Sequence, residues 1–214
     1  MQRTIVIFVL LMELWGFSFP VFANSLRCYK SDFNLPIPSD DKPKGNHSKG
    51  WMKDAIINVT DHILISDLNV NVNLTHTNVI DLQIFLKGPD KTKICLNMFD
   101  VYNLDDFPRD QNYKDYINTV FDDEADTFIK GHKAPFTGRF KPIKPFNLSV
   151  FDNHDAYGPW RLQVYDAFYA DTGRLNSFEL IITTPTPEPA TAILLILGAG
   201  FIHLRNRLSH FRNI

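Results

Sequence analysis

Residues 68–74 read Leu-Asn-Val-Asn-Val-Asn-Leu, and this strict alternation of apolar and polar side chains constrains the fold more than any other feature of the chain. Side chains of a β-strand point in turn to its two faces, so the pattern gives one dry face and one wet face. Other intervals repeat the alternation, the last four less clearly: 82–86, 160–164, 178–182, 56–59, 63–65, 94–96 and 146–150. Short strands of this kind predict an all-β fold, an antiparallel β-sandwich.

Composition argues against a helical alternative, because the chain contains 13 prolines and 18 phenylalanines and no window shows an apolar repeat of helical period. Residues 24–50 are polar, contain three prolines and show no apolar period. We therefore expect a polar linker over 24–50 and one folded domain over 51–184.

The N-terminal segment has the three parts of a secretory signal peptide. Arg3 is a basic start, Ile5–Met12 is apolar, and Val21-Phe22-Ala23 supplies the small residues that a signal peptidase reads. The alternative, an N-terminal membrane anchor, needs about eighteen uncharged apolar residues, whereas Glu13 interrupts this run. We expect a signal peptide over 1–23 that is cleaved after Ala23.

The C-terminal segment, 185–214, combines Pro187-Glu188-Pro189 with an apolar stretch at 191–204 and two arginines at 205–207. This arrangement resembles the PEP-CTERM sorting tail of exported proteins of Gram-negative bacteria. The resemblance implies recognition by an exosortase-type processing enzyme, a transient transmembrane anchor in the inner membrane, and then release or attachment at the cell envelope. The alternative is a permanent C-terminal membrane helix, for which the apolar stretch is short.

The charge of the remaining chain excludes one class of partner. Residues 24–184 keep 18 of the basic residues and 22 of the acidic ones, a net charge of −4. Binding to nucleic acid depends on a positive surface, so we expect no nucleic-acid partner.

Within the predicted domain, six separated motifs resemble, in their order, the P domain (P/Homo B domain) of proprotein convertases and bacterial subtilisin-like proteases. They lie at 67–77, 81–90, 118–125, 134–142, 156–160 and 171–175. The resemblance implies a jelly-roll β-sandwich of about eight strands. Two residues depart from the family, since Lys91 and Asn153 stand where it often has glycine.

The proteases of this family carry a separate catalytic domain, for which the 161 residues of 24–184 leave no room. The sequence contains no GxSxG or HExxH motif and no Asp/His/Ser set in family order. We therefore expect a non-catalytic exported binding or structural module, with extracellular polysaccharide or a secreted protease as its partner. The alternative is an accessory domain that stabilises or targets a separately encoded subtilisin-like serine endopeptidase. A third hypothesis is a lectin-like sugar binder, which rests on the predicted jelly-roll architecture alone.

Two groups of aspartates are candidate cation ligands. Asp122 and Asp123 lie in an acidic run, and Asp166 and Asp171 flank the connection before the last strand. Calcium prefers six to eight oxygen ligands, and related bacterial P domains carry calcium, so we expect some of these four carboxylates to hold a structural Ca²⁺. The alternative is that they are solvated and accept hydrogen bonds from backbone amides.

Cys28 and Cys95 either form a disulfide, which export permits, or remain two thiols. Trp160 alternates with Leu162 and Val164, so we expect it in the core and not at a sugar-binding surface.

Overall fold

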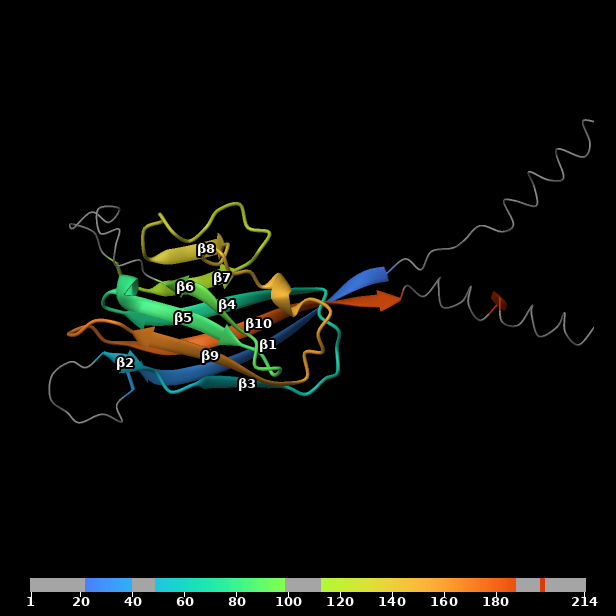
Figure 1. The fold of residues 1–214 in the computed structure, drawn as a ribbon, viewed down its shortest axis with the longest axis horizontal. Helices are drawn as coiled ribbons and strands as arrows, with labels where there is room; N and C mark the ends of the chain where they lie inside the picture. The colour runs from blue at the N-terminus through green and yellow to red at the C-terminus, as the bar shows by residue number, and fades with distance from the viewer. Residues whose placement is uncertain (1–21, 40–48, 99–112, 188–196, 199–214) are drawn as a thin grey trace, which may run out of the picture. The chain divides into compact units, whose positions relative to one another are not determined.

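The computed structural model describes residues 22–39, 49–98, 113–187 and 197–198 of the chain, and Ser25–Thr184 form one compact unit. The first sheet has the order β1 (Phe22–Ile37), β10 (Gly173–Pro187), β4 (Asp67–His76), β7 (Tyr116–Phe121) and β8 (Phe136–Phe140). The second has the order β2 (Gly50–Trp51), β9 (Gly158–Asp166), β5 (Leu82–Lys87) and β6 (Lys93–Met98), and β3 (Ala55–Val59) also pairs with β9. In Figure 1, β5 and β9 lie in front of β4, β10 and β1.

This architecture confirms the predicted all-β sandwich, with ten strands in place of about eight. β4, β5 and β9 pair antiparallel with their neighbours, whereas β7 and β8 run parallel, with Tyr116 opposite Phe136 and Phe121 opposite Phe140. Among the described residues, the short 3₁₀ helices η1 (Val79–Asp81) and η3 (Ser149–Phe151) lie in the connections.

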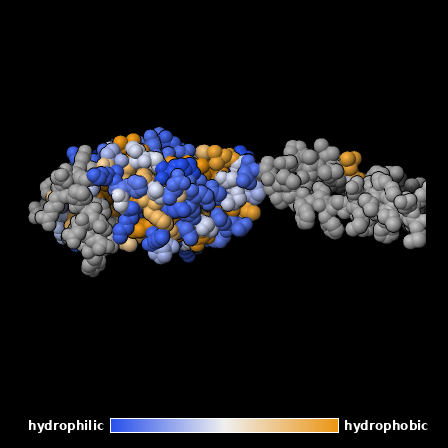
Figure 2. Space-filling model, turned by 90° about the horizontal axis from the view of Figure 1, so that it is seen from above, coloured by the Kyte–Doolittle hydropathy of each residue, from blue (hydrophilic) through white to orange (hydrophobic). Residues whose placement is uncertain are grey.

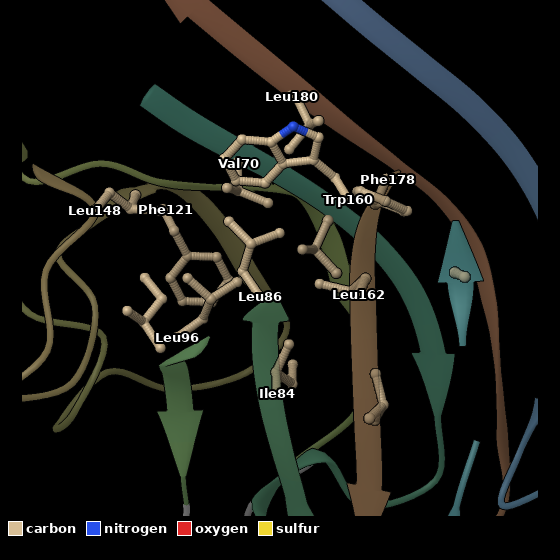
Figure 3. Packing of buried hydrophobic residues seen from close by; sticks show 14 of the residues in the cluster. Val70, Ile84, Leu86, Leu96, Phe121, Leu148, Trp160, Leu162, Phe178 and Leu180 are labelled. Atoms are coloured by element: carbon tan, nitrogen blue, oxygen red, sulfur yellow. The ribbon is translucent and has the colours of Figure 1, made fainter. Parts of the chain in front are cut away.

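The core consists of the alternating side chains on which the fold prediction rests. Val70 and Val72 of β4 and Leu86 of β5 are fully buried, while Trp160 of β9 is 1% exposed and donates from Nε1 to the Ala156 carbonyl at 2.8 Å. Figure 3 shows side chains of the two sheets pointing toward one another. The prediction that Trp160 belongs to the core is confirmed. The asparagines of the same alternation are less buried, and Figure 2 shows mainly hydrophilic residues on the visible face of this unit.

The predicted linker over 24–50 is wrong for its first half. Residues up to Ile37 form β1, which pairs with β10 at the edge of the first sheet. Phe33 stacks on Phe178 of β10 with ring centroids 5.5 Å apart, and Ile37 is 1% exposed. An edge strand has one sheet neighbour, so a polar sequence with few apolar side chains is sufficient to hold it.

Most of the two predicted terminal signals lie outside the described residues. Residues 1–21 of the signal peptide and residues 188–196 and 199–214 of the tail are not described, whereas Ala23 lies in β1 and Pro187 ends β10. In the part of the chain that the structure describes, no helix is both long and apolar enough to cross a membrane.

Candidate functional site

A pocket of about 540 Å³ opens at the end of the sandwich where β5 ends and β9 begins. It lies between the turn after β5 and the connection from η3 to β9. Its lining residues are Pro89, Asp90, Phe151, His154, Asp155, Tyr157 and Trp160. Cavities of this size with an aromatic lining and few polar groups are typical of ligand-binding sites.

Two buried aromatic rings form the apolar part of the pocket. Phe151 and Trp160 are each 1% exposed, and their rings meet edge to face with centroids 4.9 Å apart. The neighbouring turn depends on glycine for this packing, because a Cβ on Gly88 would lie 2.7 Å from Cε1 of Phe151. Gly158 has a φ of +121°, and a Cβ there would lie 2.9 Å from Cβ of Pro89. The two glycines allow the walls to approach this closely.

Backbone hydrogen bonds fix the loop that carries the polar side of the pocket. The Ile65 amide donates to the His154 carbonyl at 3.0 Å, and the Asn153 amide donates to the Ile65 carbonyl at 2.8 Å. The Ala156 amide donates to the Ile63 carbonyl at 2.9 Å. These three hydrogen bonds to Ile63 and Ile65 hold the loop in place, so the pocket is preformed.

Two histidine–aspartate pairs stand at the rim. His62 Nδ1 lies 2.6 Å from Asp155 Oδ2, and His154 Nδ1 lies 3.2 Å from Asp90 Oδ2. The ring of Tyr157, which is 51% exposed, stacks on the imidazole of His62 with centroids 4.1 Å apart. The rim therefore combines carboxylates with an accessible aromatic face.

Both rim carboxylates are held in the ionised form. The hydrogen bond from His62, followed by that from the Tyr157 amide, lowers the pKa of Asp155. Partial burial opposes ionisation of Asp90, but hydrogen bonds from Thr92 and the charge of His154 outweigh it and lower the pKa of that carboxyl. The pocket therefore has two ionised carboxylates at its mouth, each paired with a histidine.

The sequence interpretation missed this site. It assigned Trp160 to the core alone and singled out none of the other lining residues as a candidate site residue. The pocket joins the 88–90 turn and the 151–160 segment, with His62 added from a third segment. The run from His154 to Trp160 contains Asp155 and three aromatic rings within seven residues, and this local signal could have pointed to the site.

The structure separates the four predicted cation ligands into two groups at opposite ends of β4. Phe121, which precedes Asp122, pairs with Val70 near the start of β4, whereas Gly173 near Asp171 pairs with His76 at its end. A strand rises by roughly 3.3 Å per residue, so the ends of the ten-residue β4 lie roughly 30 Å apart. One ion cannot bind both groups.

Asp122 and Asp123 already have donors for both carboxylate oxygens. Asp122 accepts hydrogen bonds from the Glu124 amide at 2.8 Å and from Nε of Arg139 at 2.7 Å, and it forms an ion pair with that guanidinium. Asp123 accepts from the amides of Leu148 at 3.0 Å and Ser149 at 2.8 Å. These contacts match the alternative interpretation, in which the acids accept backbone donors.

The other group contains buried oxygens without donors. Asp166 is fully buried and Asp81 is 4% exposed, and Oδ2 of each lacks a hydrogen-bond partner, as does Oδ1 of Asn78. His76 Nε2 lies 3.4 Å from Asp166 Oδ2. Burial, followed by the carboxylates of Asp171 and Asp166, raises the pKa of Asp81 to about 7. Asp171 itself accepts from Thr77 Oγ1 at 2.7 Å.

The donor-free oxygens of Asp81, Asp166 and Asn78 are of the type that binds Ca²⁺, so this end fits a cation better than the Asp122 end. Asp81 and Asn78 were not among the predicted ligands. Across residues 22–39, 49–98 and 113–187, no group of three or more His, Cys, Asp or Glu side chains is placed to hold a metal ion.

Of the two alternatives left open for Cys28 and Cys95, the structure shows two free thiols and no disulfide between them. Cys28 is exposed on β1 and Cys95 is buried on β6, and these strands belong to different sheets. The Cys95 thiol donates to the Asn97 carbonyl at 3.4 Å, and burial raises its pKa to about 12.

Comparisons with known proteins leave the family open. No protein-family model matches the chain, and no curated protein matches it. Among solved structures, the serine protease of Aeromonas sobria, alone and in complex with its chaperone, gives a TM-score of 0.44 at 14% identity. These matches cover 82% of this chain and 29% of the protease chain. A likeness this low assigns neither family nor activity, so the resemblance to P domains stays a prediction.

Proposed function

We propose that the chain is a non-catalytic, exported module of the bacterial cell envelope that binds a partner through the pocket at Tyr157. The preformed cavity, with its buried aromatic rings and two ionised carboxylates, is the observation that supports binding. The rim histidines face carboxylates and not a hydroxyl or thiol nucleophile, so the described pairs provide positioning and charge.

The binding proposal is tested with secreted and envelope fractions of the source bacterium passed over the immobilised full-length chain. The expected result is a reproducible partner whose capture is lost with Tyr157→Ala and kept with Tyr169→Ala. Tyr169 is 62% exposed and lies outside the pocket lining, which makes it a matched surface control. Equal capture by both variants would refute the pocket as the binding site.

Export and sorting are proposed from the sequence of the two ends. A signal peptidase cleaves after Ala23, and an exosortase processes the tail near Pro187-Glu188-Pro189 after a transient stay in the inner membrane. Mass spectrometry of the native protein tests both steps. We expect an N-terminus at Asn24 and a C-terminus near Glu188, whereas an intact Ile214 contradicts sorting.

The sequence motifs favour one alternative function, that of an accessory domain for a separately encoded subtilisin-like serine endopeptidase. Its distinguishing outcome is the identity of the captured partner. A subtilase in the captured fraction supports it, and an extracellular polysaccharide supports an adhesive or matrix role for the same pocket.

We also propose a structural cation, with Ca²⁺ as the first choice, held by Asp81 and Asp166 with the Asn78 amide oxygen. The donor-free buried oxygens support it. A cation there would offset the mutual repulsion of buried carboxylates and tie the η1 connection to the end of β9.

A further inference from the structure

The polar lining of the pocket is dominated by two carboxylates that already have protein partners. Asp155 contacts His62 and accepts from the Tyr157 amide, and Asp90 accepts from Thr92 and lies 3.2 Å from His154 Nδ1, so a ligand donor uses their remaining lone pairs. The polar side chains of the lining are Asp90, His154, Asp155 and the Tyr157 hydroxyl, and no lysine, arginine, asparagine or glutamine is among the lining residues of the described chain. Trp160 Nε1 already donates to Ala156. Lys91 follows Asp90 in the turn, but it does not line the pocket.

The side chains of the lining thus offer more acceptors than donors, and this favours some classes of ligand over others. A neutral sugar hydroxyl both donates and accepts, so sugar sites need donors as well as acceptors. An ammonium or guanidinium group only donates, and it gains from the two ionised carboxylates. The chemistry at the rim therefore matches a cation better than a neutral sugar.

The aromatic residues match the rest of a basic side chain. Tyr157 presents an accessible ring face beside Asp155, and a cation over such a face is attracted by the ring quadrupole. The methylene stem of lysine or arginine packs well on apolar surface while its head stays in a polar setting. Tyr157, Phe151 and Pro89 supply that apolar surface next to the carboxylates.

We propose that the pocket binds a lysine or arginine side chain presented by a peptide segment of a partner protein. This inference rests on the proposed function and specifies the chemistry of its ligand. The head group lies between Asp90 and Asp155, and the stem lies along Tyr157.

Isothermal titration of the purified full-length chain tests the proposal with a matched pair of probes. One is a blocked tetrapeptide, acetyl-Leu-Arg-Leu-Ala-amide, and the other carries citrulline, a neutral isostere, in place of arginine. We expect the citrulline peptide to bind about tenfold more weakly, from the combined loss of a cation–π contact and a partly exposed charge pair. Added salt should reduce binding of the arginine peptide more than that of the citrulline peptide.

Substitutions at the pocket test whether the preference for the arginine peptide arises there. Asp155→Asn should weaken arginine-peptide binding by about fivefold while the citrulline peptide is unaffected, because the amide keeps the shape and loses the charge. Asp32→Asn, an exposed aspartate on β1, is the control and should leave both affinities unchanged. Tyr157→Phe should retain binding and Tyr157→Ala should lose it.

A third probe, a neutral cello-oligosaccharide, separates this inference from the binding proposal itself. Oligosaccharide binding that Tyr157→Ala abolishes, without preference for the arginine peptide, overturns the basic-ligand inference and keeps the pocket. Equal affinity for arginine and citrulline peptides also overturns it. No binding of any probe by the folded chain counts against both proposals.

Discussion

Lys91 has a backbone conformation that favours glycine, and this can be tested at the scale of one residue. Its φ is +76°, and its amide donates to the Gly88 carbonyl at 3.1 Å in the turn beside the pocket. The left-handed conformation costs a side chain roughly 1–2 kcal/mol, and glycine costs roughly 0.5–1 kcal/mol in chain entropy. We expect Lys91→Gly to raise the free energy of unfolding by about 0.5–1 kcal/mol, measured by urea denaturation.

The control for Lys91→Gly is Lys87→Gly, on β5, where the strand conformation gives glycine no advantage. That change should lower the free energy of unfolding by about 0.5–1 kcal/mol. The same sign for both variants would show that the turn at Lys91 is not strained. Asn153, the other departure from the glycine pattern, also has a positive φ of +63°, as its sequence position predicts.

At the scale of the elements, strands with clear alternation could be predicted, whereas β1, β7 and β8 could not. β4, β5 and β9 have both sheet neighbours and a buried face, so their alternation is strict. Of the described side chains of β1, Tyr29, Phe33, Leu35 and Ile37 pack against the core, interspersed with polar residues and Pro36. β7 and β8 also escaped prediction, because their exposed residues blur the period and the parallel pairing of β8 depends on distant contacts.

The role of β1 gives a prediction at the same scale. If β1 is part of the sandwich, Phe33→Ala removes a stacked ring from Phe178 and should lower the free energy of unfolding by about 2 kcal/mol, below the range for fully buried phenylalanines. Leu26→Ala, on the same strand but 63% exposed, should change it by less than about 0.5 kcal/mol. Guanidinium denaturation measures both. A neutral Phe33→Ala would restore the linker interpretation of 24–37.

At the scale of the whole molecule, residue types could be read from the sequence but their grouping could not. The four predicted aspartates are identical in type but lie at two ends of β4. β7 and β10 both run antiparallel to β4, and Asp122 follows the end of β7 whereas Asp171 precedes the start of β10. The pocket is the opposite case, because His62, Asp90 and Tyr157 are distant in sequence but lie close together in the fold. The pairing of β5 with β9 and the contacts of 63–65 with 153–156 bring them together. The spacing of these residues along the chain therefore predicts neither the separation of the aspartates nor the assembly of the pocket.

The proposed cation gives a prediction for the stability of the whole molecule. Because the donor-free oxygens lie where η1 meets the end of β9, an ion there binds only the folded chain. Ca²⁺ at about one hundred times its Kd should add roughly 2.7 kcal/mol to the free energy of unfolding, and EDTA should remove this gain. Differential scanning calorimetry with added Ca²⁺ and with EDTA measures the shift in Tm.

Two substitutions decide which end of the sandwich is responsible for that shift. Asp166→Asn removes the charge of a fully buried carboxylate and should abolish the difference between the Ca²⁺ and EDTA samples. Asp123→Asn should lower Tm in both samples, because it weakens acceptance from the Leu148 and Ser149 amides, while leaving the difference intact. If Asp123→Asn abolishes the response and Asp166→Asn does not, the cation binds at the end where every oxygen has a protein donor, and the argument from donor-free oxygens is wrong. If Tm is the same with Ca²⁺ and with EDTA in the unmodified chain, the Asp81 carboxyl is neutralised by a proton and not by a metal ion, in keeping with its raised pKa.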